Sequence, residues 1–321
     1  MRATAIAQPN IALIKYWGKR DCDLNLPAVG SLSVTLGSIG TRTTVEFDAT
    51  LNADRVYINE QEADSANRRV ENCLDRFREK AGIAHKAIVT TANDFPTGAG
   101  LASSASGFAA LVVAADRALE LNLGADELVD LARISSGSAP RSLFGGFVLL
   151  ENDSGGGTRC SSVLAPETWP WSIMIAVTSD APKKVSSTDG MESSRTTSPY
   201  FSRWVETHDA DLQAAVANIE KRDFEKLGEL AERSCLKMHA VAMTSSPPLL
   251  YWSGATLECA QNIRELRKSG VSTFFSIDAG PQLKAFCLPE NSEMVRESLE
   301  SVPGVLRVIS SKLGEGARIV E

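Results

Sequence analysis

Four short segments of the chain carry residue types that could bind an anion or move a proton. The first runs from Pro96 to Ser104 (PTGAGLASS) and leads into a stretch with helical apolar spacing. Small residues allow a backbone to approach an anion closely, and the free N–H groups at the start of a helix favour negative charge. No Gly-Lys-Ser or Gly-Lys-Thr follows, so the segment is not a Walker A loop. It predicts either a phosphate-binding loop or a Gly-rich turn that packs a helix closely on a sheet.

Two further segments are rich in hydrogen-bond donors. Asn10–Arg20 (NIALIKYWGKR) places Lys15 and Lys19 among apolar and aromatic residues of an acidic chain. Such lysines either bind an anionic ligand or lie at a strand edge with their stems buried. Ser135–Arg141 (SSGSAPR) offers hydroxyl groups and one guanidinium fork that suits a carboxylate or a phosphate. A solvated loop could have the same composition, so both interpretations stay open.

Asp278 is the fourth candidate. It follows the apolar run Val271–Ile277 (VSTFFSI) and precedes Ala-Gly-Pro, so its carboxylate should emerge at the end of a buried strand. A carboxylate in this position can accept or orient a proton, or it can simply cap the turn.

The elements that position these segments are predicted by apolar periodicity. Strands are expected at residues 31–36, 42–47, 56–58, 86–91, 143–150, 171–178 and 271–277. Helices are expected at residues 65–80, 101–121, 126–134, 199–216, 224–243 and 255–269, the third with Asp126 as its N-cap. After residue 180 the sequence is polar, and three stretches with helical apolar spacing follow. We therefore predict a domain boundary near Ala181, with domains at 1–181 and 182–321.

Composition narrows the possible classes of protein. The 321 residues include 33 Lys and Arg against 40 Asp and Glu, a net charge of −7, which argues against a protein devoted to nucleic acid. The six cysteines form no CxxC pair and the three histidines have no metal-ligand spacing, so we expect a reducing cytoplasm and no metal site built from protein ligands. No apolar segment reaches about 18 residues and no apolar h-region is visible, so we expect neither a membrane span nor a signal peptide.

In combination and in this order, the segments resemble the diphosphomevalonate decarboxylase family, within the small-molecule kinases that include galactokinase, homoserine kinase and mevalonate kinase. The matching stretches span nearly the whole chain and are NIALIKYWGKR (10–20), PTGAGLASSASG (96–107), SGSAPRSLFGG (136–146), VSSTDGM (185–191) and FSIDAGP (275–281). The resemblance implies an α/β (α+β) fold: an N-terminal ATP-binding domain similar to ribosomal protein S5, a C-terminal α+β domain, and the active site between them. It also implies that ATP, with Mg²⁺, phosphorylates the 3-hydroxyl of mevalonate 5-diphosphate. Phosphate and carbon dioxide then leave, and isopentenyl diphosphate remains.

The resemblance further implies a role for individual residues. Asp278 would be the catalytic carboxylate with Lys15 beside it, and Arg141, held by Asn10, would clamp the substrate carboxylate. Contacts to the substrate and its diphosphate would come from Tyr16, Lys19, Ser136, Ser138 and Ser187. The ATP phosphates would lie on Pro96, Gly98, Ala99, Gly100, Leu101, Ala102, Ser103 and Ser104, with Ser104 near the transferred group. The enzyme would be a cytoplasmic homodimer without nucleic-acid or membrane partners.

Three other functions would share part of this pattern. A decarboxylase of mevalonate 5-phosphate would share the residues around the reacting carbon and differ only in the distal phosphate contacts. A kinase that stops at phosphorylation is disfavoured by the presence of both Arg141 and Asp278 in their decarboxylase contexts. An RNA-binding module is conceivable because S5-like domains contact RNA, but the net charge of −7 argues against it.

Overall fold

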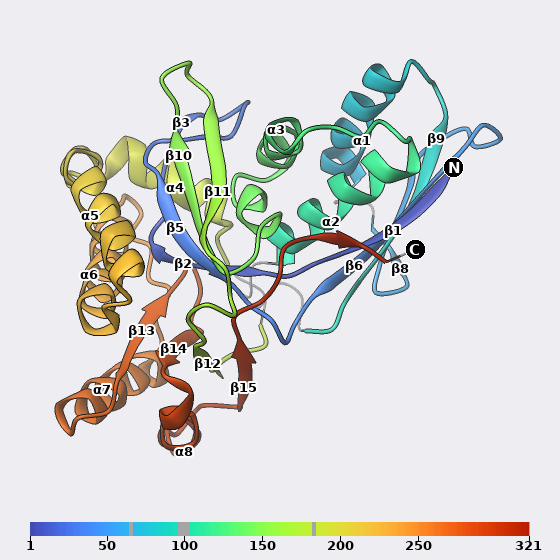
Figure 1. Ribbon diagram of the computed structural model, residues 1–321. Coiled ribbons are helices and arrows are strands. Elements are labelled where there is room, and N and C mark those ends of the chain that lie inside the picture. The colour runs from blue at the N-terminus through green and yellow to red at the C-terminus, as the bar shows by residue number, and fades with distance from the viewer. Residues whose placement is uncertain (64–66, 96–102, 182–183, 321) are drawn as a thin grey trace.

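The computed structural model describes residues 1–63, 67–95, 103–181 and 184–320 (Figure 1). Its N-terminal part is built on a six-stranded sheet in the order β16-β1-β6-β9-β7-β8. The strands are β1 (Arg2–Ala7), β6 (Thr41–Asp48), β7 (Arg55–Ile58), β8 (Gln61–Glu62), β9 (Lys86–Asn93) and β16 (Arg318–Ile319). Helices α1 (Asn67–Ala81) and α2 (Ser103–Ala118) share an apolar core with this sheet. In β6 buried and exposed side chains alternate, as expected of a strand with one face against a core.

A four-stranded sheet in the order β11-β10-β5-β2 lies at the centre of the molecule (Figure 1). Its strands are β2 (Asn10–Ile14), β5 (Ser31–Thr35), β10 (Phe147–Asn152) and β11 (Thr158–Leu164). Every residue of β2 and β5 is buried, which fixes the chain on either side of them. Next to this sheet are the short pair β3 (Lys19–Asp21) and β4 (Leu26–Pro27), helix α3 (Ala125–Ser135) and the 3₁₀ turn η1 (Ala139–Ser142).

The C-terminal part holds a second four-stranded sheet, in the order β13-β14-β12-β15. Its strands are β12 (Ser172–Val177), β13 (Thr273–Ile277), β14 (Leu283–Cys287) and β15 (Arg307–Lys312). The helices are α4 (Ser187–Thr197), α5 (Phe201–Lys221), α6 (Phe224–Met243), α7 (Gly254–Lys268) and α8 (Ser292–Glu300), with the 3₁₀ turn η2 (Pro289–Asn291) before α8. The predicted two-part α/β architecture is confirmed.

One aromatic cluster joins the central sheet to the C-terminal part. Trp171 packs edge-on against Phe147 of β10, with ring centroids 4.9 Å apart, and against Phe224 of α6 at 5.1 Å. Phe274 of β13 and Phe286 of β14 stack on each other at 5.0 Å in the same core. Aromatic side chains bury large apolar areas, so this cluster fixes the central sheet against the C-terminal sheet.

Several predicted elements needed correction. Helix α4 was not predicted, because its sequence STDGMESSRTT is polar; it starts where the Ser186 hydroxyl accepts from the Asp189 N–H. The N-cap of α3 is Gly124 and not Asp126, and the Glu127 side chain accepts from the Gly124 N–H. The strand expected from residue 143 begins at Phe147, because the preceding chain turns through Gly146 at a positive φ of 71°.

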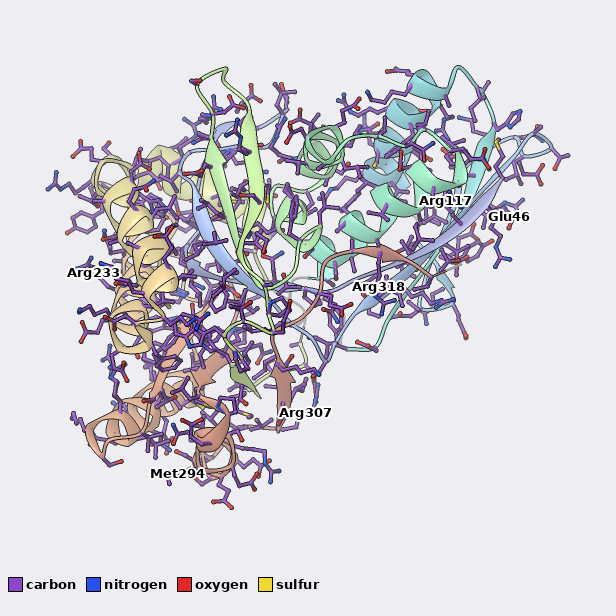
Figure 2. All side chains as sticks on the ribbon, viewed as in Figure 1. Glu46, Arg117, Arg233, Met294, Arg307 and Arg318 are labelled. Carbon is purple, nitrogen blue, oxygen red and sulfur yellow. The ribbon has the colours of Figure 1, made fainter. Side chains whose placement is uncertain are left out.

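The predicted domain boundary near Ala181 stays a prediction; β12, which precedes it, pairs with β14 and β15. Charged side chains such as Arg233, Arg307 and Arg318 lie at the periphery (Figure 2). Among the described residues, no helix is long and apolar enough to cross a membrane.

Candidate active site

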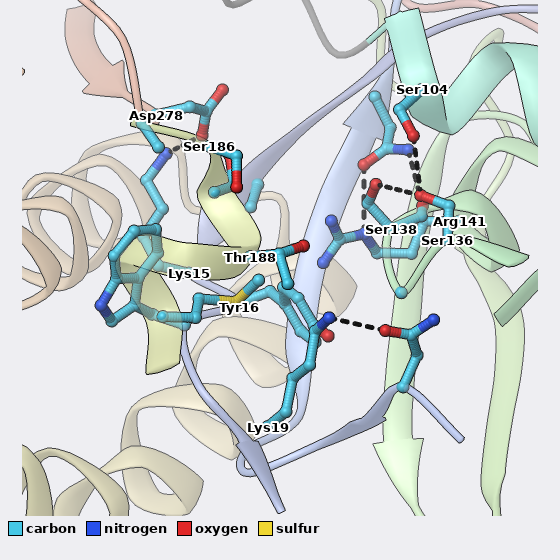
Figure 3. A pocket seen from close by; sticks show the side chains of 18 of the residues that line it. Lys15, Tyr16, Lys19, Ser104, Ser136, Ser138, Arg141, Ser186, Thr188 and Asp278 are labelled. Atoms are coloured by element: carbon cyan, nitrogen blue, oxygen red, sulfur yellow. Dashed lines mark hydrogen bonds and ion pairs between the residues drawn. The ribbon is translucent and has the colours of Figure 1, made fainter. Parts of the chain in front are cut away.

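A cavity of about 350 Å³ is lined by residues of the central sheet, α2, η1, α4 and the end of β13 (Figure 3). The structure brings together here every predicted site residue that it describes: Asn10, Lys15, Tyr16, Lys19, Ser103, Ser104, Ser136, Ser138, Ser187, Arg141 and Asp278. The predicted phosphate-loop residues Pro96, Gly98, Ala99, Gly100, Leu101 and Ala102 lie outside the described residues.

Asp278 follows the buried strand β13 directly, so its carboxylate is held at the cavity wall. Lys15, which follows β2, places its Nζ 2.5 Å from Asp278 Oδ1, and Lys284 of β14 places its Nζ 3.3 Å from Oδ2. Both lysine side chains are 1% exposed, whereas 26% of the Asp278 side chain remains exposed. Burial alone would raise the pKa of Asp278, but the two ammonium groups outweigh it and hold that pKa well below its usual range. The carboxylate is therefore ionised at neutral pH.

Arg141 is a buried cation without a carboxylate partner in the described part of the chain. Its Nε donates to Asn10 Oδ1 at 3.1 Å, and its Nη1 donates to Ser31 Oγ at 2.5 Å. Asn10 in turn donates to Ser142 Oγ and to the Ser138 carbonyl, so η1 and β2 fix the guanidinium together. Burial lowers the pKa of Arg141, but an arginine stays charged over the working range. A buried, oriented guanidinium that faces a cavity is suited to an anionic group of a ligand.

Tyr16 and Lys19 supply two further donors. The buried Tyr16 hydroxyl has no hydrogen-bond partner within the described structure, and burial raises its pKa to about 12, so it is a neutral donor. A Cβ at position 137 would collide with this hydroxyl, which explains Gly137 in the SGS sequence. Lys19 Nζ donates to Asn25 Oδ1 at 2.6 Å, and burial lowers the pKa of Lys19. Asn25 also donates to the Ile134 carbonyl, which holds the lysine against the end of α3.

A row of hydroxyl groups leads from the first turn of α2 into this cavity. Ser104 Oγ lies 3.1 Å from Ser136 Oγ, which lies 3.5 Å from Ser138 Oγ (Figure 3). No acidic residue occupies the first turn of α2. Free N–H groups and hydroxyls at a helix N-terminus are suited to phosphate oxygens.

A second cavity, of about 240 Å³, adjoins the first at Arg69, Ser103 and Ser104. Its walls are mainly apolar and come from β7, β9 and α2, with Val56, Val89, Phe108 and Leu111 among the lining residues. The Arg69 guanidinium lies over the Phe108 ring, 4.8 Å from its centroid, and donates to the Ser135 carbonyl. An apolar cavity that meets an anion-binding helix start can accept a nucleotide, with its base in the former and its phosphates at the latter.

The comparisons with known proteins agree with this site. Residues 7–162 match the model of the diphosphomevalonate decarboxylase-like N-terminal domain, and residues 173–319 match that of the mevalonate 5-diphosphate decarboxylase C-terminal domain. The diphosphomevalonate decarboxylase of Candida albicans is 34% identical, with 98% of this chain and 96% of that protein covered. This chain belongs to the diphosphomevalonate decarboxylase family. The enzyme class and the reaction predicted from the sequence, ATP-dependent decarboxylation of mevalonate 5-diphosphate, are confirmed by these matches.

Solved structures extend the family match to the whole fold. The mevalonate diphosphate decarboxylase of Staphylococcus aureus has a TM-score of 0.94 at 35% identity, with 100% of this chain and 98% of that chain covered. That of Enterococcus faecalis has a TM-score of 0.91 at 35% identity, with 100% and 99% covered. A relative described as MDDEF, with a TM-score of 0.93 at 36% identity and coverage of 100% and 99%, was solved in complex with MVAPP, AMPPCP and magnesium.

Several residues that complete the site were not predicted from the sequence. Lys284 contacts Asp278, Ser31 and Asn25 hold Arg141 and Lys19, and Arg69 lies between the two cavities. A signal existed for Lys284, since a single lysine in the apolar strand LKAFC has to be explained. No local signal marks Ser31, because its partner Arg141 is 110 positions away in the sequence. None marks Asn25 either, because its contact with Lys19 depends on the turn between β3 and β4, which was not predicted.

Proposed function

We propose that the larger cavity carries out this decarboxylation, with Asp278 and Arg141 at its two ends. The 3-hydroxyl oxygen of mevalonate 5-diphosphate forms a bond to the γ-phosphorus of ATP, and ADP leaves. The C3–O bond then breaks and inorganic phosphate leaves. The electron pair of the C1–C2 bond forms the C2–C3 double bond as C1 departs as carbon dioxide. The observation that carries this proposal is one cavity that holds an ionised carboxylate and, separately, a buried guanidinium that has no acidic partner among the described residues.

Asp278 would orient the 3-hydroxyl and receive its proton as the bond to phosphorus forms. A carboxylate paired with two ammonium groups is a weak base, so orientation is its larger contribution. Lys15 also lines the cavity, so its ammonium would lie close enough to offset the charge on the phosphoryl group in transit.

Arg141 would bind the substrate carboxylate until it leaves as carbon dioxide. Its position is fixed by Asn10 and Ser31, so only its outer edge is available to a ligand. Tyr16, Lys19, Ser138 and Ser187 would bind the diphosphate, and Ser136 the substrate between the two ends. Each of them lines the same cavity.

ATP would lie with its base in the smaller, apolar cavity and its phosphates at the start of α2, on Ser103, Ser104 and the residues from Pro96 to Ala102. Within the described residues no three acidic, histidine or cysteine side chains group together as metal ligands. Mg²⁺ therefore fits as an ion held mainly by phosphate oxygens and water, with hydroxyls such as that of Ser104 nearby. When bound, it supplies charge neutralisation on the phosphates.

A homodimer in the cytoplasm belongs to the same proposal. The family resemblance supports the dimer, and six cysteines that are all free support a reducing compartment such as the cytoplasm. The molar mass in solution, measured by light scattering after size-exclusion chromatography, tests the dimer.

The number of phosphates on the substrate is tested by Lys19. We expect the wild type to prefer mevalonate 5-diphosphate over 5-phosphate by at least about tenfold in kcat/KM, equivalent to about 1.4 kcal/mol. Lys19→Ala should remove most of this preference by impairing use of the diphosphate, because it deletes the cation beside Asn25. The measurement is kcat/KM for both substrates in both proteins. Equal or better use of the monophosphate by the wild type would contradict the proposal.

A further inference from the structure

Lys284 contacts the reaction centre without lining the cavity. Its Nζ lies 3.3 Å from Asp278 Oδ2, while Lys15 Nζ lies 2.5 Å from Oδ1. Lys15 and Asp278 line the cavity, but Lys284 does not, so it lies behind the carboxylate. We propose that Lys284 is a positioning residue for the decarboxylation, which holds Asp278 from behind in the orientation and charge state that the 3-hydroxyl requires. This inference rests on the role proposed above for Asp278.

The sheet register places Lys284 beside Asp278. Strand β14 pairs antiparallel with β13, so that Lys284 lies opposite Ser276, and it pairs on its other side with Ile175 of β12. Its neighbours Leu283 and Ala285 point to the opposite face, into the apolar cluster shared with α7 and α8. A lysine in the middle of a fully buried strand is costly unless its charge is used. Asp278 is the acidic group within ion-pair distance of it in the described chain.

The other charged or titratable groups around Asp278 cannot replace Lys284. Helix α6 contributes His239, whose pKa burial lowers to about 3, and Cys235, whose pKa burial raises to about 11, so both are neutral at working pH. Arg141 acts on Asp278 from η1 but donates to Asn10 and Ser31 instead. Lys15 bonds only one of the two carboxylate oxygens. Without Lys284, Lys15 is the ammonium group left against the burial of Asp278 among the described residues, and the second carboxylate oxygen loses the contact that Lys284 provides.

The positive charge of this group also has a consequence for phosphoryl transfer. Two ammonium groups against one carboxylate leave a net charge of +1 at the wall where the γ-phosphoryl group must pass. A buried positive charge stabilises the negative charge on that group as it moves. Lys284 thus supports the transfer step more than the binding of either substrate.

Lys284→Met tests the inference, because methionine keeps the length and removes the charge. We expect kcat to fall by about 10- to 50-fold, with both KM values within about threefold. The acidic limb of the kcat profile should move up by about 1–3 pH units, because an opposite charge nearby lowers a carboxyl pKa by that much. The matched control is Lys237→Met, which also removes a lysine paired with an aspartate: Lys237 of α6 lies 2.6 Å from Asp211 of α5. Neither residue lines the cavity, so this variant should leave both kcat and the profile unchanged. The phosphate groups of ATP titrate in the same way with every variant, so the readout is the difference in the acidic limb between variant and wild type.

A second variant, Asp278→Asn, separates the possible failures. If Asp278→Asn is fully active, the proposed role of Asp278 is wrong. If Asp278→Asn is inactive while Lys284→Met shows wild-type kcat and the wild-type pH profile, only the role of Lys284 is wrong. A structural effect alone would lower kcat in Lys284→Met without moving the acidic limb, and that result also overturns the inference.

A wild-type measurement covers the case in which Lys284→Met fails to fold. The protein is labelled with ¹³C at the aspartate carboxyls, and the Asp278 signal is assigned by its loss in Asp278→Asn. We expect this signal to show no protonation above about pH 4, because both ammonium groups stabilise the ionised form. Protonation at or above an ordinary carboxyl value would overturn the inference.

Discussion

Asp278→Asn is expected to lose nearly all turnover, with kcat reduced by about 10²–10⁴-fold. The amide keeps the shape of the side chain but removes the negative charge that lies between Lys15 and Lys284. The 3-hydroxyl then lacks both its acceptor and its orientation, while the contacts to the nucleotide and to the substrate phosphates remain. Steady-state kinetics and calorimetric binding of both substrates separate these effects. A variant with a tenth or more of wild-type kcat would contradict the assignment of Asp278.

The control for this change is Asp211→Asn. Asp211 is also largely buried and also accepts from two cations, Arg233 and Lys237, both at 2.6 Å. It lies on α5, away from the cavity, so the variant should change stability without changing kcat. Loss of turnover in both variants would indicate damage to the fold in place of a specific effect at Asp278.

The second large effect is expected at Arg141. Removing one partner of a buried, hydrogen-bonded charge pair costs about 2–5 kcal/mol, so Arg141→Gln should lower kcat/KM by about 30-fold to several thousandfold. Arg141→Lys should also be impaired, because an ammonium cannot donate to Asn10, to Ser31 and to a carboxylate with the geometry of a guanidinium. An unchanged kcat/KM in Arg141→Gln would mean that the substrate carboxylate binds elsewhere.

Thermal unfolding distinguishes this role from a structural one. Arg78 is also a buried arginine, but it donates to both oxygens of the buried Asp54, so Arg78→Gln should lower the melting temperature by leaving that carboxylate unpaired. Arg141 has no acidic partner among the described residues, and its burial costs stability. Arg141→Gln should therefore keep or raise the melting temperature while it lowers kcat/KM.

Much of the fold followed from apolar periodicity. Helix α6 has the predicted bounds, Phe224–Met243, because its buried residues recur at helical spacing and Asp223 caps its start. Helix α4 was missed for the opposite reason, since small polar residues carry no such period. Its start depends on a cap at Ser186 and on packing against α6.

The candidate site, like the fold, has residues that the sequence could predict and residues that it could not. Residues that touch the cavity lie in short motifs with unusual donors, so the sequence could predict them. Residues that hold them in place do not, because their contacts arise only on folding: Ser31 meets Arg141 across 110 positions, and Lys284 meets Asp278 through the register of β13 and β14. The ion pair of Lys284 was visible only as an unexplained lysine in an apolar strand.

We expect one cavity to couple phosphoryl transfer from ATP to decarboxylation of mevalonate 5-diphosphate. The most direct measurement uses substrate labelled with ¹⁴C at the carboxylate and follows ADP and labelled carbon dioxide in the same reaction. We predict that one molecule of carbon dioxide is released for each ADP formed, with isopentenyl diphosphate as the product. ADP formed without carbon dioxide, and with a phosphorylated six-carbon acid accumulating, would contradict the claim.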